Sequence, residues 1–157
     1  MFLFYSQDKL ALGQILYRLA HRRDPVFARC VLSAFPGEAE MKRTLDMSLS
    51  GEVRTQDAPY LLAVCMRNRE QGYLAWQFVK DNWDKINEVF PSNSIVRMLS
   101  GITSLSKGDQ ADDVIAFFED HEVPQGQLTL QQILEKLRVN VALRERESER
   151  FAESLVR

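Results

Sequence analysis

Apolar residues recur along this chain at helical spacing, and Gly and Pro fall between the periodic segments. After Asp24-Pro25, the apolar side chains that occupy one helix face are Phe27, Cys30, Val31, Ala34 and Phe35. Pro36-Gly37 ends this pattern, and a further amphipathic helix is expected over Met41–Leu49. The spacing therefore predicts helices that bury one apolar face each.

The strongest periodic signal lies between residues 76 and 90. Large apolar side chains are spaced three and four positions apart there, at Trp76, Val79, Trp83, Ile86 and Phe90. This spacing predicts one helix of about four turns with a buried aromatic stripe, because each aromatic ring removes ~150–250 Å² from water. The apolar run Tyr60–Met66 is also expected to be helical, since Pro59 is acceptable in a first helical turn and unfavourable in a central strand.

Three more segments have a helical apolar face: Ile95–Ile102, Ala111–Phe118 and Leu130–Val141. Residues 144–150 carry charges of both signs, which indicates either a solvated helix face or a break before a last helix anchored by Phe151 and Leu155. The fold predicted for residues 1–157 is a single all-α domain of about eight or nine helices with short connections. Periodicity alone does not distinguish a closed bundle from a solenoid.

Charge and hydropathy argue against several classes of partner. Lys plus Arg is 20 and Asp plus Glu is 22, so the net charge of −2 gives no electrostatic reason to expect a nucleic-acid partner. The longest apolar run is far shorter than the ~20 residues that span a bilayer, and the first residues lack the basic start of a signal peptide. Cys30 and Cys65 lie in apolar stretches and are expected to be buried free thiols. We therefore expect no nucleic acid, no membrane and a cytoplasmic location.

The residues needed for catalysis are scarce. A zinc hydrolase site requires two His on one helix face beside a carboxylate, but the two histidines, His21 and His121, lie in different segments. His121 follows acidic residues at a helix end, where it is expected to interact with the helix C-terminus. Phosphate-binding loops, dinucleotide fingerprints, C-x-x-C pairs and nucleophile elbows are absent from the sequence. We expect no catalytic residue and no metal ligand in this chain.

Four blocks nevertheless form a recognisable series: Glu52–Asp57, Leu74–Trp83, Ala116–His121 with Pro124, and Thr129–Ala142. Their order and spacing resemble the C-terminal helical domain of the aminopeptidase N family of zinc aminopeptidases, and most of all its puromycin-sensitive branch. Two positions depart from that pattern. Asn68–Gln71 stands where family members usually turn with Asn-Pro-x-Gly, and Leu143 stands where a Trp is usual, followed by Arg144.

The resemblance implies an α-solenoid of antiparallel helix pairs, similar to HEAT or armadillo repeats, at the C-terminal end of a larger aminopeptidase. Such a domain folds over the catalytic domain of the same polypeptide and walls off the chamber that holds the peptide substrate. Zinc and the catalytic residues would then belong to that other domain, and the whole enzyme would remove N-terminal residues from peptides. An alternative is a stand-alone helical-repeat adapter that binds a protein or peptide in a concave groove.

The segment 52–57 is short and polar between two apolar helices, and two interpretations of it stay open. In one, Arg54 and Gln56 face the chamber, and the planar fork of Arg54 holds the carboxylate end or backbone of a peptide. In the other, Thr55 or Asp57 caps the next helix, and Arg54 pairs on the surface with Glu52 or Asp57.

Overall fold

The computed structural model describes residue 34 and residues 36–155, and within this range every regular element is a helix, as predicted. The elements are α3 (Glu38–Leu49), α4 (Ala58–Met66), α5 (Gly72–Asp81), α6 (Trp83–Val89), α7 (Ser92–Leu99), the 3-10 helix η1 (Ser100–Ser104), α8 (Gly108–Asp120) and α9 (Gln127–Leu155). The helix expected after Asp24-Pro25 lies almost entirely outside the described residues, as do Cys30 and His21.

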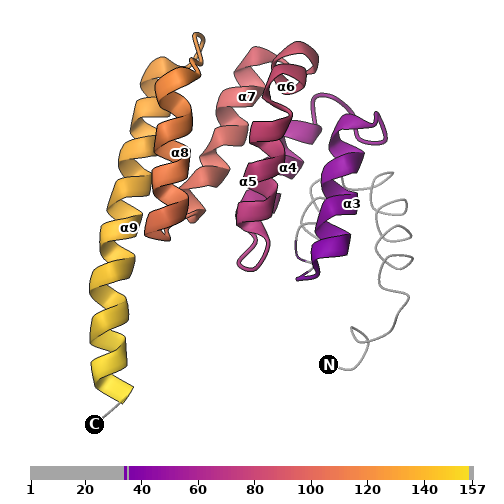
Figure 1. Ribbon diagram of the computed structural model, residues 1–157. Helices are drawn as coiled ribbons and strands as arrows, with labels where there is room; N and C mark the ends of the chain where they lie inside the picture. Colours follow the sequence, from indigo (N-terminus) through magenta and orange to yellow (C-terminus); the bar gives the residue numbers. More distant parts are fainter. Residues whose placement is uncertain (1–33, 35, 156–157) are drawn as a thin grey trace.

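The helices stand side by side in a row that begins with α3 and ends with α9 (Figure 1). The chain runs up and down along this row, so its connections gather on two opposite sides of the row, where the helices end. The α3–α4, α5–α6 and α8–α9 connections lie on one of these sides, whereas the α4–α5 turn and the η1–α8 connection lie on the other. This arrangement agrees with the predicted stacking of antiparallel helices.

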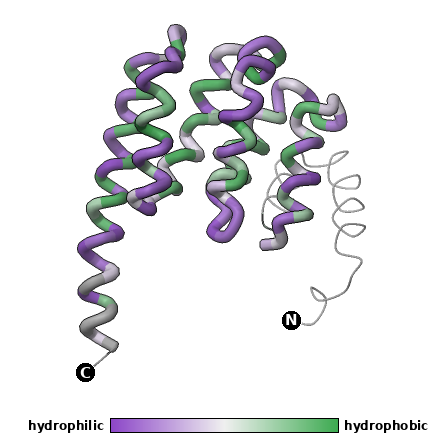
Figure 2. The backbone as a smooth tube through the Cα atoms, viewed as in Figure 1, coloured by the Kyte–Doolittle hydropathy of each residue, from purple (hydrophilic) through white to green (hydrophobic). Residues whose placement is uncertain are grey.

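Helix α4 lies at the centre of the core. It packs against α3, α5, α7 and η1, and its side chains are buried on nearly every side, as the continuous apolar run predicted. Hydrophobic positions are concentrated within the row and hydrophilic ones at the connections (Figure 2). The Cys65 thiol is free and fully buried, and burial raises its pKa to about 12. For this residue the predicted buried thiol is confirmed.

The aromatic stripe is buried as predicted, since the most exposed of its five side chains, Trp83, is only 7% exposed. The prediction of one continuous helix is wrong. Helix α5 ends at Asp81 and α6 begins at Trp83, because Asn82 has φ −113° and ψ 19° and its Nδ2 donates to the Phe78 carbonyl at 2.9 Å. Asn favours such local bonds over the helical backbone pattern. The spacing therefore identified the buried residues correctly but not the break between them.

Helix α9 runs without interruption through the mixed-charge segment, so the predicted break before a last helix is wrong and the solvated helix face is confirmed. Its first half packs on the row through Leu130 and Leu137, and Asn140 Nδ2 donates to the Thr103 carbonyl at 2.8 Å. The second half extends beyond the other helices (Figure 1), and Phe151 is 66% exposed rather than an anchor.

Gly101 allows η1 to approach α4 closely. A Cβ at this position would lie 2.6 Å from the Ala63 carbonyl oxygen and 3.0 Å from the Ala63 Cα. Both are backbone atoms of a buried helix and cannot move aside without displacing the core. The absent side chain therefore sets the distance between these two elements.

We expect Gly101→Ala to lower the free energy of unfolding by about 1–3 kcal/mol, the usual cost of forcing extra atoms into a packed core. Urea unfolding of the 157-residue chain measures this change in free energy. Gly108→Ala is the matched control, because the nearest atom to its added Cβ is Glu145 Oε1 at 3.8 Å. The control should be neutral or stabilising by up to about 1 kcal/mol. Equal losses in both variants would contradict the role of Gly101.

Candidate functional site

Asp113 on α8 connects this helix to α5 through a group of polar bonds. Its Oδ2 accepts a hydrogen bond from Trp76 Nε1 at 2.8 Å, and both carboxylate oxygens lie 2.7 Å from Lys80 Nζ. Partial burial acts to raise the pKa of Asp113, but the bonds from Lys80, Trp76 and Tyr73 outweigh it and hold the pKa below its usual value. The carboxylate is therefore ionised and fully engaged in holding two helices together.

Aromatic rings extend this junction. The rings of Trp76, Trp83, Phe117 and Phe118 contact one another with centroids 5.2–5.9 Å apart, mostly edge to face. His121 stacks on Phe117 at 3.9 Å, and its Nδ1 lies 2.8 Å from the Phe117 carbonyl oxygen, which confirms the predicted interaction with the helix C-terminus. The blocks Leu74–Trp83 and Ala116–His121 thus pack directly on each other, and their shared task is structural.

Arg54 and Gln56 lie in the connection between α3 and α4, and both are exposed. Within the described residues neither side chain makes a hydrogen bond or an ion pair, whereas the Arg54 carbonyl closes the turn by accepting from the amides of Asp57 and Ala58 at 2.8 and 2.9 Å. No side chain caps α4, and Glu52 lies 3.5 Å from Arg43 instead. The predicted cap and the predicted surface pairing of Arg54 are therefore wrong. The structure leaves both polar side chains pointing into solvent.

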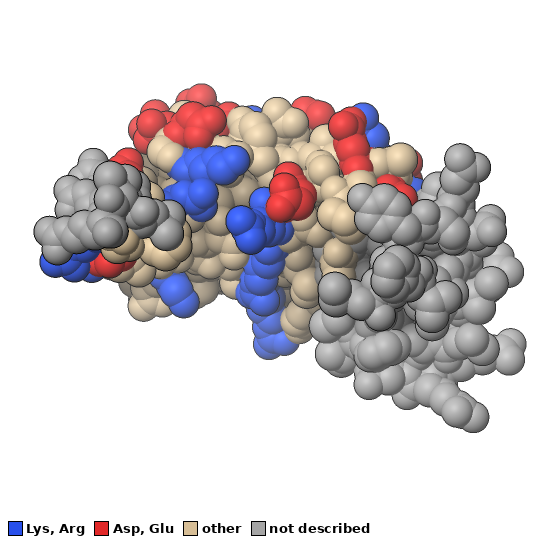
Figure 3. Space-filling model, turned by 90° about the horizontal axis from the view of Figure 1, so that it is seen from below, with Lys and Arg blue, Asp and Glu red and all other residues tan. Residues whose placement is uncertain are grey.

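A basic recess lies on the opposite side of the row from Arg54 and Gln56, where the α4–α5 turn, the η1–α8 connection and α9 meet. It has a volume of about 460 Å³, and the cations that line it are Arg67, Arg69, Lys107 and Arg144. The lining contains one carboxylate, Glu70. Seen from this side, Lys and Arg side chains gather across the middle of the face (Figure 3). We call this feature the basic recess.

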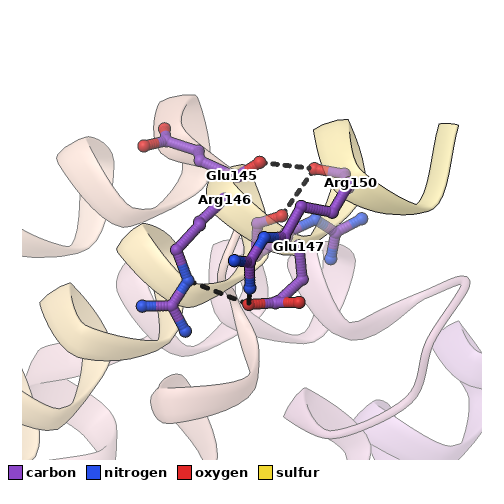
Figure 4. A network of polar contacts seen from close by, with 6 residues as sticks. Glu145, Arg146, Glu147 and Arg150 are labelled. Carbon is purple, nitrogen blue, oxygen red and sulfur yellow. Dashed lines mark hydrogen bonds and ion pairs between the residues drawn. The ribbon is translucent and has the colours of Figure 1, made fainter. Parts of the chain in front are cut away.

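Two cations of the basic recess, Arg67 and Arg144, are held by neutral partners. Arg67 Nη2 donates to Ser100 Oγ at 2.9 Å, and Arg144 Nη1 donates to Ser106 Oγ at 3.4 Å. A hydroxyl orients a guanidinium without cancelling its charge. One turn further along α9 the situation is different, since Glu147 pairs there with Arg146 at 2.8 Å and with Arg150 at 3.5 Å (Figure 4). Of Arg144, Arg146 and Arg150, only Arg144 forms no ion pair with a described residue.

Sequence reasoning missed the basic recess, because its residues come from three separated segments. The available signal was indirect. Arg69 lies within Asn68–Gln71, the turn that differs from the family pattern, and Arg144 follows Leu143, which stands where family members usually have Trp. Both departures from the family pattern thus fall at the same place in the fold.

Metal-binding groups do not assemble in the part of the chain that the structure describes, where no three His, Cys, Asp or Glu side chains come together. His21 lies outside that part. Among the same residues, no helix has the length and apolarity needed to cross a membrane.

The row of helices and its interlocked α5–α8 junction define an all-helical structural domain. Comparison with known proteins gives its family: the sequence model of the ERAP1-like C-terminal domain matches residues 23–139. The chain belongs to the ERAP1-like C-terminal domain family.

Individual relatives agree with this assignment. Aminopeptidase M1-B of Oryza sativa subsp. japonica is 32% identical over 99 residues, which cover 61% of this chain and 11% of that protein. Endoplasmic reticulum aminopeptidase 1 of Rattus norvegicus is 36% identical over 102 residues, 62% of this chain and 11% of that protein. Aminopeptidase M1-C of Oryza sativa subsp. japonica is 28% identical over 133 residues, which cover 83% of this chain and 15% of that protein. The chain thus spans only a small part of the length of these relatives, and the resemblance to aminopeptidases is confirmed.

We expect Asp113→Asn to lower the free energy of unfolding by about 1 kcal/mol at pH 7, a figure discounted for the partial exposure of the Lys80 pair. Because the folded pKa is depressed, this contribution is present above the unfolded value near 3.8 and is lost as pH falls through the folded pKa. Urea unfolding at pH 7, 5 and 3 should therefore show the same deficit at pH 7 and 5 and a smaller one at pH 3.

Asp112→Asn serves as the control, because Asp112 is the exposed neighbour on the same helix. It should leave stability unchanged within about 0.5 kcal/mol. A deficit of Asp113→Asn that did not depend on pH would show that the carboxylate charge contributes nothing to the junction.

Proposed function

We propose that this chain is the C-terminal domain of a zinc aminopeptidase that removes N-terminal residues from peptides. One observation carries the proposal: the family match over residues 23–139 together with relatives that are aminopeptidases and of which this chain covers only 11–15%. The zinc ion and the catalytic residues would lie in a catalytic domain of the same polypeptide, which is the proposed partner. The proposed compartment is the cytoplasm, where a free thiol such as Cys65 stays reduced.

In this proposal the domain acts as a wall of the peptide chamber. The stacked helices supply the surface, and the Asp113 junction holds α8 on α5. A HEAT-type repeat and a closer relation to the puromycin-sensitive branch remain predictions from the sequence blocks. The alternative function, a stand-alone adapter, predicts a mature polypeptide that lacks an H-E-x-x-H segment. Sequencing the coding region upstream of residue 1, with the intact mass of the native protein, distinguishes the two.

Arg54 and Gln56 are the proposed contacts to the peptide. Their support is that both side chains are exposed at a helix connection and are not engaged by other described residues. An Arg in this state presents its planar fork to a carboxylate without first breaking an existing pair. Gln56 adds an amide that can bond to a peptide backbone.

We expect the isolated chain to contain no stoichiometric zinc and to lack peptidase activity, because zinc enzymes need at least three convergent protein ligands and the described residues provide no such group. Elemental analysis and an assay with aminoacyl amide substrates measure both properties. Chelator-sensitive hydrolysis by the pure chain at one zinc per molecule would overturn the proposal that catalysis belongs to another domain.

In the intact enzyme, Arg54→Ala should raise KM for free-acid peptides several residues long by about tenfold, the effect of losing one charge-assisted contact of ~1.4 kcal/mol. A single-residue amide substrate does not extend to Arg54 and should be cleaved at the normal rate. Arg43→Ala is the matched control, because this nearby Arg already faces Glu52 at 3.5 Å. An equal loss for both substrates, or a lower melting temperature without a kinetic change, would assign Arg54 a structural role.

A further inference from the structure

We propose that the basic recess binds a small anion that carries phosphate groups. The inference stands apart from the proposed aminopeptidase function, since it rests only on the residues that line the recess. Four cations and one carboxylate give this lining a net charge of +3, although the chain as a whole is at −2. The positive charge is therefore concentrated here against the overall balance of the protein.

Within the described part of the chain, three of the four cations form no ion pair: Arg67, Lys107 and Arg144. Arg67 and Arg144 are bonded to serine hydroxyls, and Lys107 is exposed and forms no ion pair there. Glu70 lies 3.8 Å from Arg69, but the Arg69 side chain is 95% exposed, so water screens this pair strongly. Holding like charges in one recess is unfavourable, and an anion bound among them relieves that repulsion.

Three carboxylates lie near the recess but outside its lining: Asp109 in the first turn of α8, Asp113, which bonds to Tyr73, and Glu145. The Glu145 carboxylate lies beside Gly108 at the start of α8, and it is not part of the lining. These charges offset some of the positive potential, but the lining itself holds four cations and one carboxylate.

The donors around the recess come from three separate elements, which favours phosphate over carboxylate. Arg67 and Arg69 come from the α4–α5 turn, Lys107 from the connection before α8, and Arg144 from α9. Donors that enter from three separate elements match an anion with oxygens in several directions. A phosphate presents three or four oxygens in a tetrahedral array, whereas a carboxylate presents two in one plane. Gln110 and Tyr73 add neutral polar groups to the same lining.

The size of the recess indicates a small molecule. Its volume of about 460 Å³ lies in the range of small-ligand sites. Its lining is mainly polar, so the ligand is held by charge and hydrogen bonds and not by apolar burial. Such binding weakens steeply as ionic strength increases, because salt screens charges that are exposed to water.

Isothermal titration of the full 157-residue chain with inorganic tripolyphosphate tests the proposal. We expect saturable binding with a dissociation constant of about 10 µM to 1 mM at low salt, weakened about tenfold or more at high salt. Citrate and hexaglutamate are the comparison probes, since they present carboxylates as a small molecule and as an acidic peptide segment. Both should bind at least about fivefold more weakly than tripolyphosphate.

The variant Lys107→Gln/Arg144→Gln should weaken tripolyphosphate binding by about 20-fold or more, with an unchanged melting temperature because both side chains are exposed. Lys136→Gln/Arg138→Gln is the matched control: it also removes two exposed positive charges, both on α9 and both outside the recess. The control should bind within about twofold of the parent chain. Absence of saturable heat, equal weakening in both variants, or tighter binding of citrate or hexaglutamate would each overturn the proposal.

Discussion

The arrangement of this domain depends on how the indole of Trp76 is buried. A fully buried indole needs an acceptor for its Nε1–H, since an unsatisfied buried donor costs about 1–3 kcal/mol. Asp113 supplies that acceptor from a different helix, and Lys80 supplies the charge that keeps the carboxylate ionised. The interaction fixes α8 on α5. The position of α9 follows, because α9 packs against α8, α7 and η1.

The residues that make the family recognisable are therefore mainly those that hold the helices together. Leu74–Trp83 and Ala116–His121 meet in one aromatic cluster, and Asn140 joins α9 to η1. Family membership read from such residues reports the shape of the domain and not its chemistry. This explains why the chain matches aminopeptidases clearly although its described residues bring no three His, Cys, Asp or Glu side chains together.

The exposed polar and charged side chains with a proposed function lie instead on the two sides of the row where the helices end. Arg54 and Gln56 are exposed on one side, before the start of α4, and the basic recess lies on the other side, beyond the end of α4. The length of this buried helix separates them. Connections can carry charged and polar groups that the packed row excludes, because solvent satisfies them there. The polar groups on the two sides of the domain can therefore differ without a change in the core that separates them.

The sequence by itself determined the all-α class, the buried stripe from Trp76 to Phe90 and the buried helix around Leu61, because apolar spacing records which face of a helix leaves water. It did not reveal the break at Asn82, which depends on one side-chain bond to the Phe78 carbonyl, nor the unbroken α9. The basic recess was decided only by tertiary structure. Arg67, Lys107 and Arg144 are far apart in the chain, and only helix packing brings their charges to one place.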